Sequence, residues 1–224
     1  MGTFTTRRPI TATVEVPAGT VRLAAADRTD TVVDVRPHDP ACPDDVSAAA
    51  HTRVDFADGD YADCVLRSAS GALTVGRVRG NLKADSASGR ITAATVDGAA
   101  AVSTASGDVR VDTIRGDLGV RTASGAVRVG RLDGSVRVQS ASGDVAVGAA
   151  VRGEIVAQTS SGDVAVGIVD GTAALLDLRT RSGSVRNALT PTDGPADGDD
   201  TLVVEARTTS GDIAVRRAVR PAAA

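Results

Sequence analysis

The sequence predicts an all-β fold, a parallel β-solenoid (or β-helix) whose coils are 18 residues long. The first observation is that Ser-Gly pairs recur at a constant step along the chain. The second is that apolar and polar residues alternate at the same offsets in each repeat, as in strands with one buried face. The third is that the chain has two Phe, one Tyr and no Trp. Its core must therefore be a thin layer of Val, Ala, Leu and Ile, which closely spaced strands can provide.

Each coil is predicted to consist of two nine-residue halves that turn at glycine corners. The glycines of the Ser-Gly pairs follow one another in four steps of 18, and then in steps of 19, 21 and 28, at Gly71, Gly89, Gly107, Gly125, Gly143, Gly162, Gly183 and Gly211. A second glycine lies nine residues after most of them, as at Gly80 and Gly98. Glycine suits such corners because it adopts positive φ without Cβ strain.

The coil formed by residues 107–124 shows which positions are expected to face the core. They are Val109, Val111 and Ile114 in the first half, and Leu118, Val120 and Ala123 in the second. Similar residues recur at these offsets in later coils, with an interruption at Asn187. Such recurrence is expected when each coil lies directly on the preceding one, about 4.8 Å away. Parallel crossovers are usually right-handed, which predicts a right-handed solenoid. An antiparallel meander or sandwich is the alternative.

Residues 1–64 are predicted to be diverged strands of the same single domain, which spans residues 1–224. The segments that indicate strands are Gly19 to Leu23, which repeats the offsets of a coil, and the alternating stretches Ile10 to Val16 and Val33 to Val35. Pro43, followed by small residues, predicts a short helical insertion near residues 43–53. This helix would cover an open edge of the stack.

Residues 65–217 are expected to form the regular coils. Counting back from Gly71 places Cys64 at an inward position, which predicts a buried, unreactive thiol. The acidic stretch within residues 188–200 predicts an extruded loop insertion. Residues 218–224 lose the repeat pattern and are expected to be a disordered tail.

Charge and composition argue against several classes of partner. The 28 acidic and 25 basic residues give a formal net charge of -3, which offers no basic surface for nucleic acid. The scarcity of aromatic residues also argues against stacking on single-stranded nucleic acid. No segment has the length and apolar character of a membrane span or signal peptide. The expected location is therefore cytoplasmic by default, and nothing in the sequence supports association with the cell surface.

The residue pattern indicates no cofactor and no metal site. The two histidines, His38 and His51, have no partner at metal-ligand or catalytic-triad spacing. Asp108 and its counterparts follow corner glycines, but the GGxGxD pattern of calcium-binding β-rolls is absent. A weak surface site for calcium in the acidic loop, around Asp197, Asp199 and Asp200, is the remaining alternative.

The strongest enzyme alternative is a polysaccharide-active β-helix, either a lyase or a hydrolase. Such enzymes place carboxylates and basic residues together on one face. Asp112 and Asp117, beside Arg110 and Arg121, could form such a cluster. Mixed Asp and Arg on outward strand faces also keep a solenoid hydrated and balanced in charge. We favour this second interpretation and assign no catalytic residues.

Paired hydroxyl columns flank the corner alanines and are expected to face outward. The residues of this candidate interaction surface are Thr104, Ser106, Thr122, Ser124, Ser140 and Ser142. Hydroxyls in turns usually bond to nearby backbone groups, and we favour that structural role. A Ser/Thr array that binds a surface is the functional alternative.

The motifs TASGDVRV at residues 104–111 and SASGDVAV at residues 140–147 resemble a bacterial family of β-strand-repeat proteins of unknown function, often labelled adhesins. The resemblance covers roughly residues 65–217. It implies a solenoid with an adhesion or scaffold role, and it supplies no catalytic residues. The sequence therefore predicts a non-enzymatic scaffold or adhesin-like protein that binds a protein or surface partner.

Overall fold

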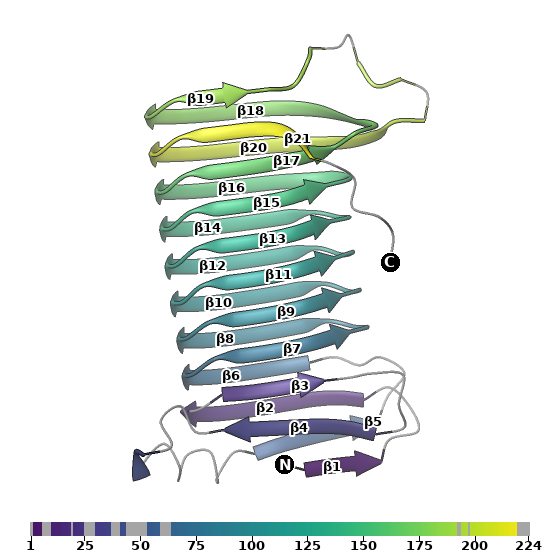
Figure 1. The fold of residues 1–224 in the computed structure, drawn as a ribbon, viewed down its shortest axis with the longest axis vertical. Coiled ribbons are helices and arrows are strands. Elements are labelled where there is room, and N and C mark those ends of the chain that lie inside the picture. The colour runs from purple at the N-terminus through teal and green to yellow at the C-terminus, as the bar shows by residue number, and fades with distance from the viewer. Residues whose placement is uncertain are drawn as a thin grey trace.

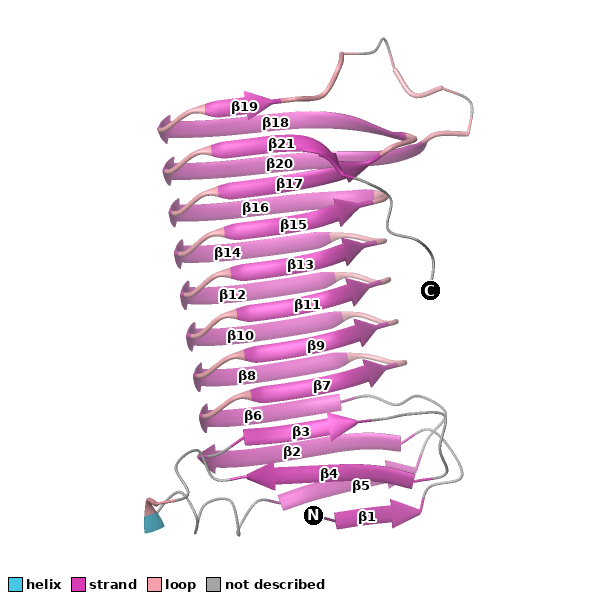
Figure 2. Cartoon of the chain, viewed as in Figure 1, coloured by secondary structure: helices cyan, strands magenta, loops and turns pink. Residues whose placement is uncertain are grey.

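The computed structural model describes residues 2–5, 10–18, 20–24, 30–36, 41–43, 53–58, 64–191, 194–196 and 198–218. Two sheets face each other over one thin core and run the length of the stack (Figure 1). We call the 11-stranded sheet, which contains β7, sheet A, and the 10-stranded sheet, which contains β6, sheet B. Strand dominates the described chain (Figure 2). The predicted all-β solenoid is thereby confirmed, whereas its right-handedness stays a prediction.

The regular coils alternate between the two sheets. Their strands are β6 (Cys64–Ser70), β7 (Leu73–Val78), β8 (Leu82–Ser88), β9 (Ile91–Val96), β10 (Ala100–Ser106), β11 (Val109–Ile114), β12 (Leu118–Ser124), β13 (Val127–Leu132), β14 (Val136–Ser142), β15 (Val145–Ala150), β16 (Gly153–Ser161) and β17 (Val164–Val169). From β6 to β15, each pairs in parallel with the equivalent strand of the next coil, so that Val109 lies beside Val127 and Leu118 beside Val136. The predicted step of 18 residues is therefore the register of the sheets as far as β14 and β15, and the next pairings have a step of 19, as between Val145 and Val164.

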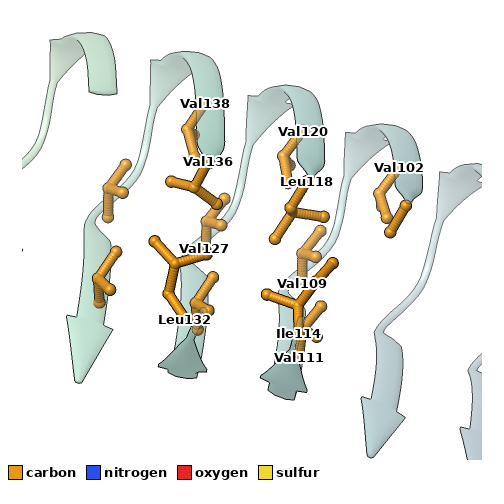
Figure 3. Packing of buried hydrophobic residues seen from close by; sticks show 14 of the residues in the cluster. Val102, Val109, Val111, Ile114, Leu118, Val120, Val127, Leu132, Val136 and Val138 are labelled. Carbon is orange, nitrogen blue, oxygen red and sulfur yellow. The ribbon is translucent and has the colours of Figure 1, made fainter. Parts of the chain in front are cut away.

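The core is a double layer of aliphatic side chains between the sheets (Figure 3). Val109, Val111 and Ile114 of β11 face Leu118 and Val120 of β12, and all five are at most 2% exposed. The absence of large aromatic side chains lets the two sheets stay close while their β-branched residues interdigitate.

One inward assignment was wrong. Ala123 is exposed, and Thr122 beside it is buried. Strict alternation from Leu118 places residues 118, 120 and 122 on the core face, so residue 123 must face outward. The apolar nature of alanine outweighed the strand period in that prediction. Ala69, at the equivalent position of β6, is exposed as well.

The N-terminal strands, some of them antiparallel, include three that the sequence predicts and two, at Gly2–Thr5 and Arg53–Asp58, that it does not. They are β1 (Gly2–Thr5), β2 (Ile10–Ala18), β3 (Thr20–Ala24), β4 (Asp30–Arg36) and β5 (Arg53–Asp58). β2 and β3 form a diverged coil in parallel with β6 and β7, and Val21 lies beside Leu73 as the offsets indicated. β4 and β5 then pair antiparallel to β3 and β2 and cover this end of both sheets. Pro43 is helical, Arg53 already belongs to β5, and the rest of the predicted helix lies outside the described residues.

The last two coils are stacked out of sequence order. Their strands are β18 (Thr172–Ser182), β19 (Val185–Asn187), β20 (Asp200–Ser210) and β21 (Ile213–Ala218). β20 lies between β16 and β18, and β21 lies between β17 and β19. The expectation that each coil lies directly on the preceding one is therefore wrong here. Figure 1 shows the acidic connection between β19 and β20 extending beyond the stack.

A polar residue in the core column accounts for this order. Asn187 of β19 lies beside Val215 of β21, which in turn lies beside Val166 of β17. Val215 is 1% exposed, whereas Asn187 is exposed and accepts a hydrogen bond from the Leu189 N–H at 2.9 Å. An amide in the interior position would lose its water without gaining partners. The fully apolar coil is therefore buried, and the coil with Asn187 is at the end. Ala218 belongs to β21, so the predicted tail is wrong at its first residue, and residues 219–224 lie outside the described residues.

Candidate interaction surface

Aspartates after the Ser-Gly corners bind the backbone of the next coil. Asp108 Oδ1 accepts a hydrogen bond from the Ala126 N–H at 3.1 Å, and Asp144 Oδ1 accepts one from the Asp163 N–H at 2.9 Å. In the same way, Asp163 Oδ1 accepts a hydrogen bond from the Asp212 N–H at 2.8 Å, and Asp212 Oδ1 accepts one from the Ser184 N–H at 2.8 Å. These bonds follow the spatial order of the coils rather than the sequence order. The aspartates therefore satisfy corner N–H groups between strands.

The two hydroxyl columns do not both face outward, which corrects the prediction. Thr104 and Thr122 are 5% and 7% exposed, and Ser140 is half-buried. Thr122 Oγ1 donates to the Ser124 carbonyl oxygen at 3.0 Å, and equivalent bonds are made by Ser86 and Thr159. The favoured role in local backbone bonding is confirmed for Thr122 and its equivalents Ser86 and Thr159, whereas Thr104 Oγ1 and Ser140 Oγ are buried without a hydrogen-bond partner among the described residues. The other three residues of the predicted surface, Ser106, Ser124 and Ser142, are exposed.

The opposite corner carries alternating charges. Arg115 and Asp133 follow Asp97 at steps of 18, and Arg152 Nε contacts Asp133 Oδ1 at 2.7 Å. Asp97 receives hydrogen bonds from Arg77, at 2.9 Å, and from Arg115. Burial alone would raise the pKa of Asp97, but these hydrogen bonds and the two positive charges together lower it. Because the arginines are about half exposed, these pairs stabilise the stack only modestly.

A shallow hollow of 670 Å³ lies on the outer face of sheet B. Its floor includes the small residues Ala101, Ser103 and Gly119, from β10 and β12. Longer side chains surround it, from Lys83, Asp85, Arg121, Arg137, Gln139 and Glu154. Ala101 and Gly119 are paired neighbours between Lys83 and Arg137 in one outward column. The hollow exists because two small residues lie between two long ones.

Gly119 differs from the corner glycines in having room for a side chain. A Cβ at Gly125 would lie 2.2 Å from the Gly107 carbonyl oxygen, and φ there is 131°. At Gly119 the nearest atom to a Cβ would be the Ala100 carbonyl oxygen, at 4.0 Å. Glycine within a strand costs about 0.5–1 kcal/mol relative to alanine. The stack does not require glycine here, yet glycine keeps the hollow open.

The charges around the hollow are unequally neutralised. Glu154 pairs with Arg137 at 3.8 Å, and Asp85 pairs with Arg67 at 3.8 Å. In the part of the chain that the structure describes, Lys83 and Arg121 form no ion pair. The unpaired charge at the hollow is therefore positive.

A family model described as Toastrack DUF4097 matches residues 12–216, from β2 to β21. The chain belongs to the Toastrack family. This family is a domain of unknown function. The prediction of a family of unknown function is thus confirmed, whereas the adhesin label is not. The match covers both the diverged N-terminal coil and the coil inserted at the C-terminal end. No match to a curated protein or to a solved structure was found.

The Toastrack fold separates the residues proposed for an enzymatic cluster. Arg110 and Asp112 pair with each other at 2.8 Å on β11 of sheet A. Asp117 and Arg121 line the hollow on sheet B. Asp117 Oδ1 accepts a hydrogen bond from the Ser135 N–H at 3.3 Å, as the other corner aspartates do. The four residues therefore lie on two opposite faces.

The remaining sequence predictions for this Toastrack chain concern metal sites, the thiol of Cys64 and membrane spans, and they are compared with its described residues. Among them, no group of three His, Cys, Asp or Glu residues could hold a metal ion. His38, His51 and Asp197 lie outside those residues, and Asp199 Oδ2 accepts a hydrogen bond from the Ala196 N–H. Cys64 is 6% exposed, as predicted, and burial raises the pKa of its thiol to about 12. Within the described chain, no helix is long and apolar enough to span a bilayer.

Sequence reasoning missed the hollow and the alternating corner, although both leave a signal. At the hollow, one outward column with a step of 18 consists of Lys83, Ala101, Gly119 and Arg137. Columns of apolar or hydroxyl residues do not reveal the hollow, because its signal is a change in side-chain size along the column. A pair of small residues within an outward column indicates a depression.

Proposed function

We propose that this Toastrack chain is a non-enzymatic interaction protein that binds a partner protein at the hollow of sheet B. The observation that supports this most directly is Gly119, a strand glycine that the backbone does not need. Its retention has a stability cost, and a binding surface is a reason to keep it. A solenoid presents such a surface on a rigid stack, because its strands are paired on both sides.

The charges at the hollow support a partner segment that carries carboxylates. Of the cations that line the hollow, Lys83 and Arg121 form no ion pair with described residues, so an acidic side chain placed between them would gain attraction at little desolvation cost. The existing acids at the hollow are engaged by arginines or a backbone N–H. That engagement favours binding over general acid-base chemistry, where one carboxyl must exchange a proton.

The alternatives have weaker support. A polysaccharide-active enzyme needs acids gathered on one face, and Asp112 and Asp117 lie on different sheets. A Ser/Thr-array binder needs a flat face of hydroxyls, and the inward turn of Thr104 and Thr122 leaves a single exposed column. An adhesin-like role and a cytoplasmic location both remain predictions.

The test fills the hollow without changing the fold. Gly119→Gln places a long side chain where a Cβ has room, and Ala165→Gln adds the same side chain to the exposed outer face of β17 on sheet A. We expect crosslinking and affinity capture from native cells to return proteins that the Gly119→Gln variant loses and the Ala165→Gln variant retains. Equal capture by both variants, with unchanged melting temperatures, would show that the hollow does not bind the partner.

A further inference from the structure

The C-terminal coil, formed by β18 and β19, is an open end of the solenoid. Both are the last strands of their sheets, so one backbone edge of each has no neighbour within the described chain. β18 offers an edge of eleven residues. Leu176 and Leu178 of β18 are half-buried, whereas Val204 and Ala206 beside them in β20 are 0% exposed. By contrast, antiparallel strands cover the N-terminal end.

We propose that a second copy of this chain binds to this open end, with β18 antiparallel to its own counterpart. A two-fold axis perpendicular to both sheets would join sheet A to sheet A and sheet B to sheet B. Inward side chains stay inward across such a junction, because directly opposite residues in a sheet share a face. The two open core ends would then cover each other, as in an isologous dimer.

The charges on β18 select one register. Asp177 and Arg179 both face outward, and they pair with each other at 2.8 Å within the strand. A two-fold axis through Leu178 places Asp177 of each copy opposite Arg179 of the other. Two cross-strand ion pairs would then form on the outer face, and Leu178 would meet its own counterpart in the core.

Neighbouring registers are less favourable. An axis through Asp177 would place Asp177 opposite Asp177, and an axis through Arg179 would place Arg179 opposite Arg179, although Asp177 would then lie opposite Arg181. An axis through Leu176 would place Asp177 opposite Leu175, so no ion pair would form. An axis between two residues would place an inward side chain opposite an outward one. The register centred on Leu178 is therefore the one that forms cross-strand ion pairs without placing like charges opposite each other.

The adjacent strand extends this complementarity. Glu205 of β20 lies beside Asp177, and Arg207 lies beside Arg179. Arg207 also contacts Glu205 at 2.9 Å. The end of sheet B thus carries an acidic column and a basic column side by side. The two-fold axis through Leu178 continues each column into the opposite column of the second copy. The same register places Arg181 beside Leu175, which is 70% exposed and would be covered by the aliphatic part of the arginine.

Charge reversal tests the register through sedimentation equilibrium of the full chain. Asp177→Arg and Arg179→Asp each place like charges opposite each other twice, so we expect each to raise the dimer dissociation constant at least about tenfold. The double variant Asp177→Arg with Arg179→Asp restores both pairs and should restore dimerisation. Matched controls are Asp112→Arg and Arg110→Asp, because that pair has the same 2.8 Å geometry on an interior strand. The controls should leave the dissociation constant unchanged.

Three outcomes would overturn the proposal: a wild-type chain that stays monomeric at high concentration, single reversals that do not weaken a dimer, or a double variant that remains monomeric. Circular dichroism melting of each variant separates a lost interface from a lost fold. A dimer that forms but ignores all charge changes on β18 would place the interface elsewhere. The proposal does not depend on the hollow, since Gly119→Gln leaves the end of the stack unaltered.

Discussion

The interior coil of β11 and β12 and the terminal coil of β18 and β19 have the same plan but different surroundings. In the interior coil each strand has a neighbour on both sides, and Leu118 is 2% exposed. In the terminal coil each strand has one neighbour, and Leu176 in the same column is half-buried. A coil therefore gains its burial and hydrogen bonds from adjacent coils rather than from its own sequence. Stability should therefore fall toward the open end.

The largest expected effect comes from truncating the same column at the two places. Leu118→Ala should lower the free energy of unfolding by about 2–5 kcal/mol, because it leaves a cavity between rigid neighbours. Leu176→Ala should cost about 1 kcal/mol, since water already reaches that side chain. Urea denaturation of both variants measures the difference. Equal losses would mean that the terminal coil is as well packed as the interior one.

The next largest effect on stability should come from single substitutions at the two residues that set the coil order, Val215 and Asn187. Val215→Asn buries an amide in the core column and should lower the free energy of unfolding by about 2–4 kcal/mol. Asn187→Val should leave stability unchanged or raise it slightly, because the position is exposed. Thermal unfolding of the two variants tests this. A costly Asn187→Val substitution would contradict our explanation of the stacking order.

The corner aspartates should have a moderate effect. Asp144→Ala removes the acceptor of the Asp163 N–H and should cost about 1 kcal/mol. Asp144→Asn keeps an acceptor oxygen and should cost less. The ranking of the two variants by chemical denaturation distinguishes hydrogen bonding from charge. A larger loss in Asp144→Asn than in Asp144→Ala would argue against the bonding role.

The smallest effect concerns pH. The hydrogen bonds and charges of Arg77 and Arg115 hold the pKa of Asp97 below its usual range, despite the opposing effect of burial. A carboxyl with a lower pKa in the folded chain adds stability above its unfolded pKa of about 4, and this is lost as pH falls through the folded value. Asp97→Asn should therefore flatten the fall in melting temperature on acidification. An identical pH profile in wild type and variant would exclude this contribution.

Much of the repeat architecture could be predicted from single residues. Gly19, Val21 and Leu23 revealed a diverged coil because the strand period and the coil length both constrain them. The inward Thr122 could also have been predicted, had the strand period been applied strictly. The hollow depends on neighbours 18 residues apart, so the sequence contains it only when columns are read across coils. Its partner cannot be read from any column, because binding specificity depends on a second molecule.

The sequence by itself determined the coil length, the register and the composition of the core, because each follows from a local period repeated many times. Only the tertiary structure decided the order of the last two coils. Backbone pairing does not distinguish them, since every coil offers the same edge to its neighbour. The burial of Val215 and the exposure of Asn187 make the distinction, and both depend on the assembled stack. The open end at β18 is a consequence of that order.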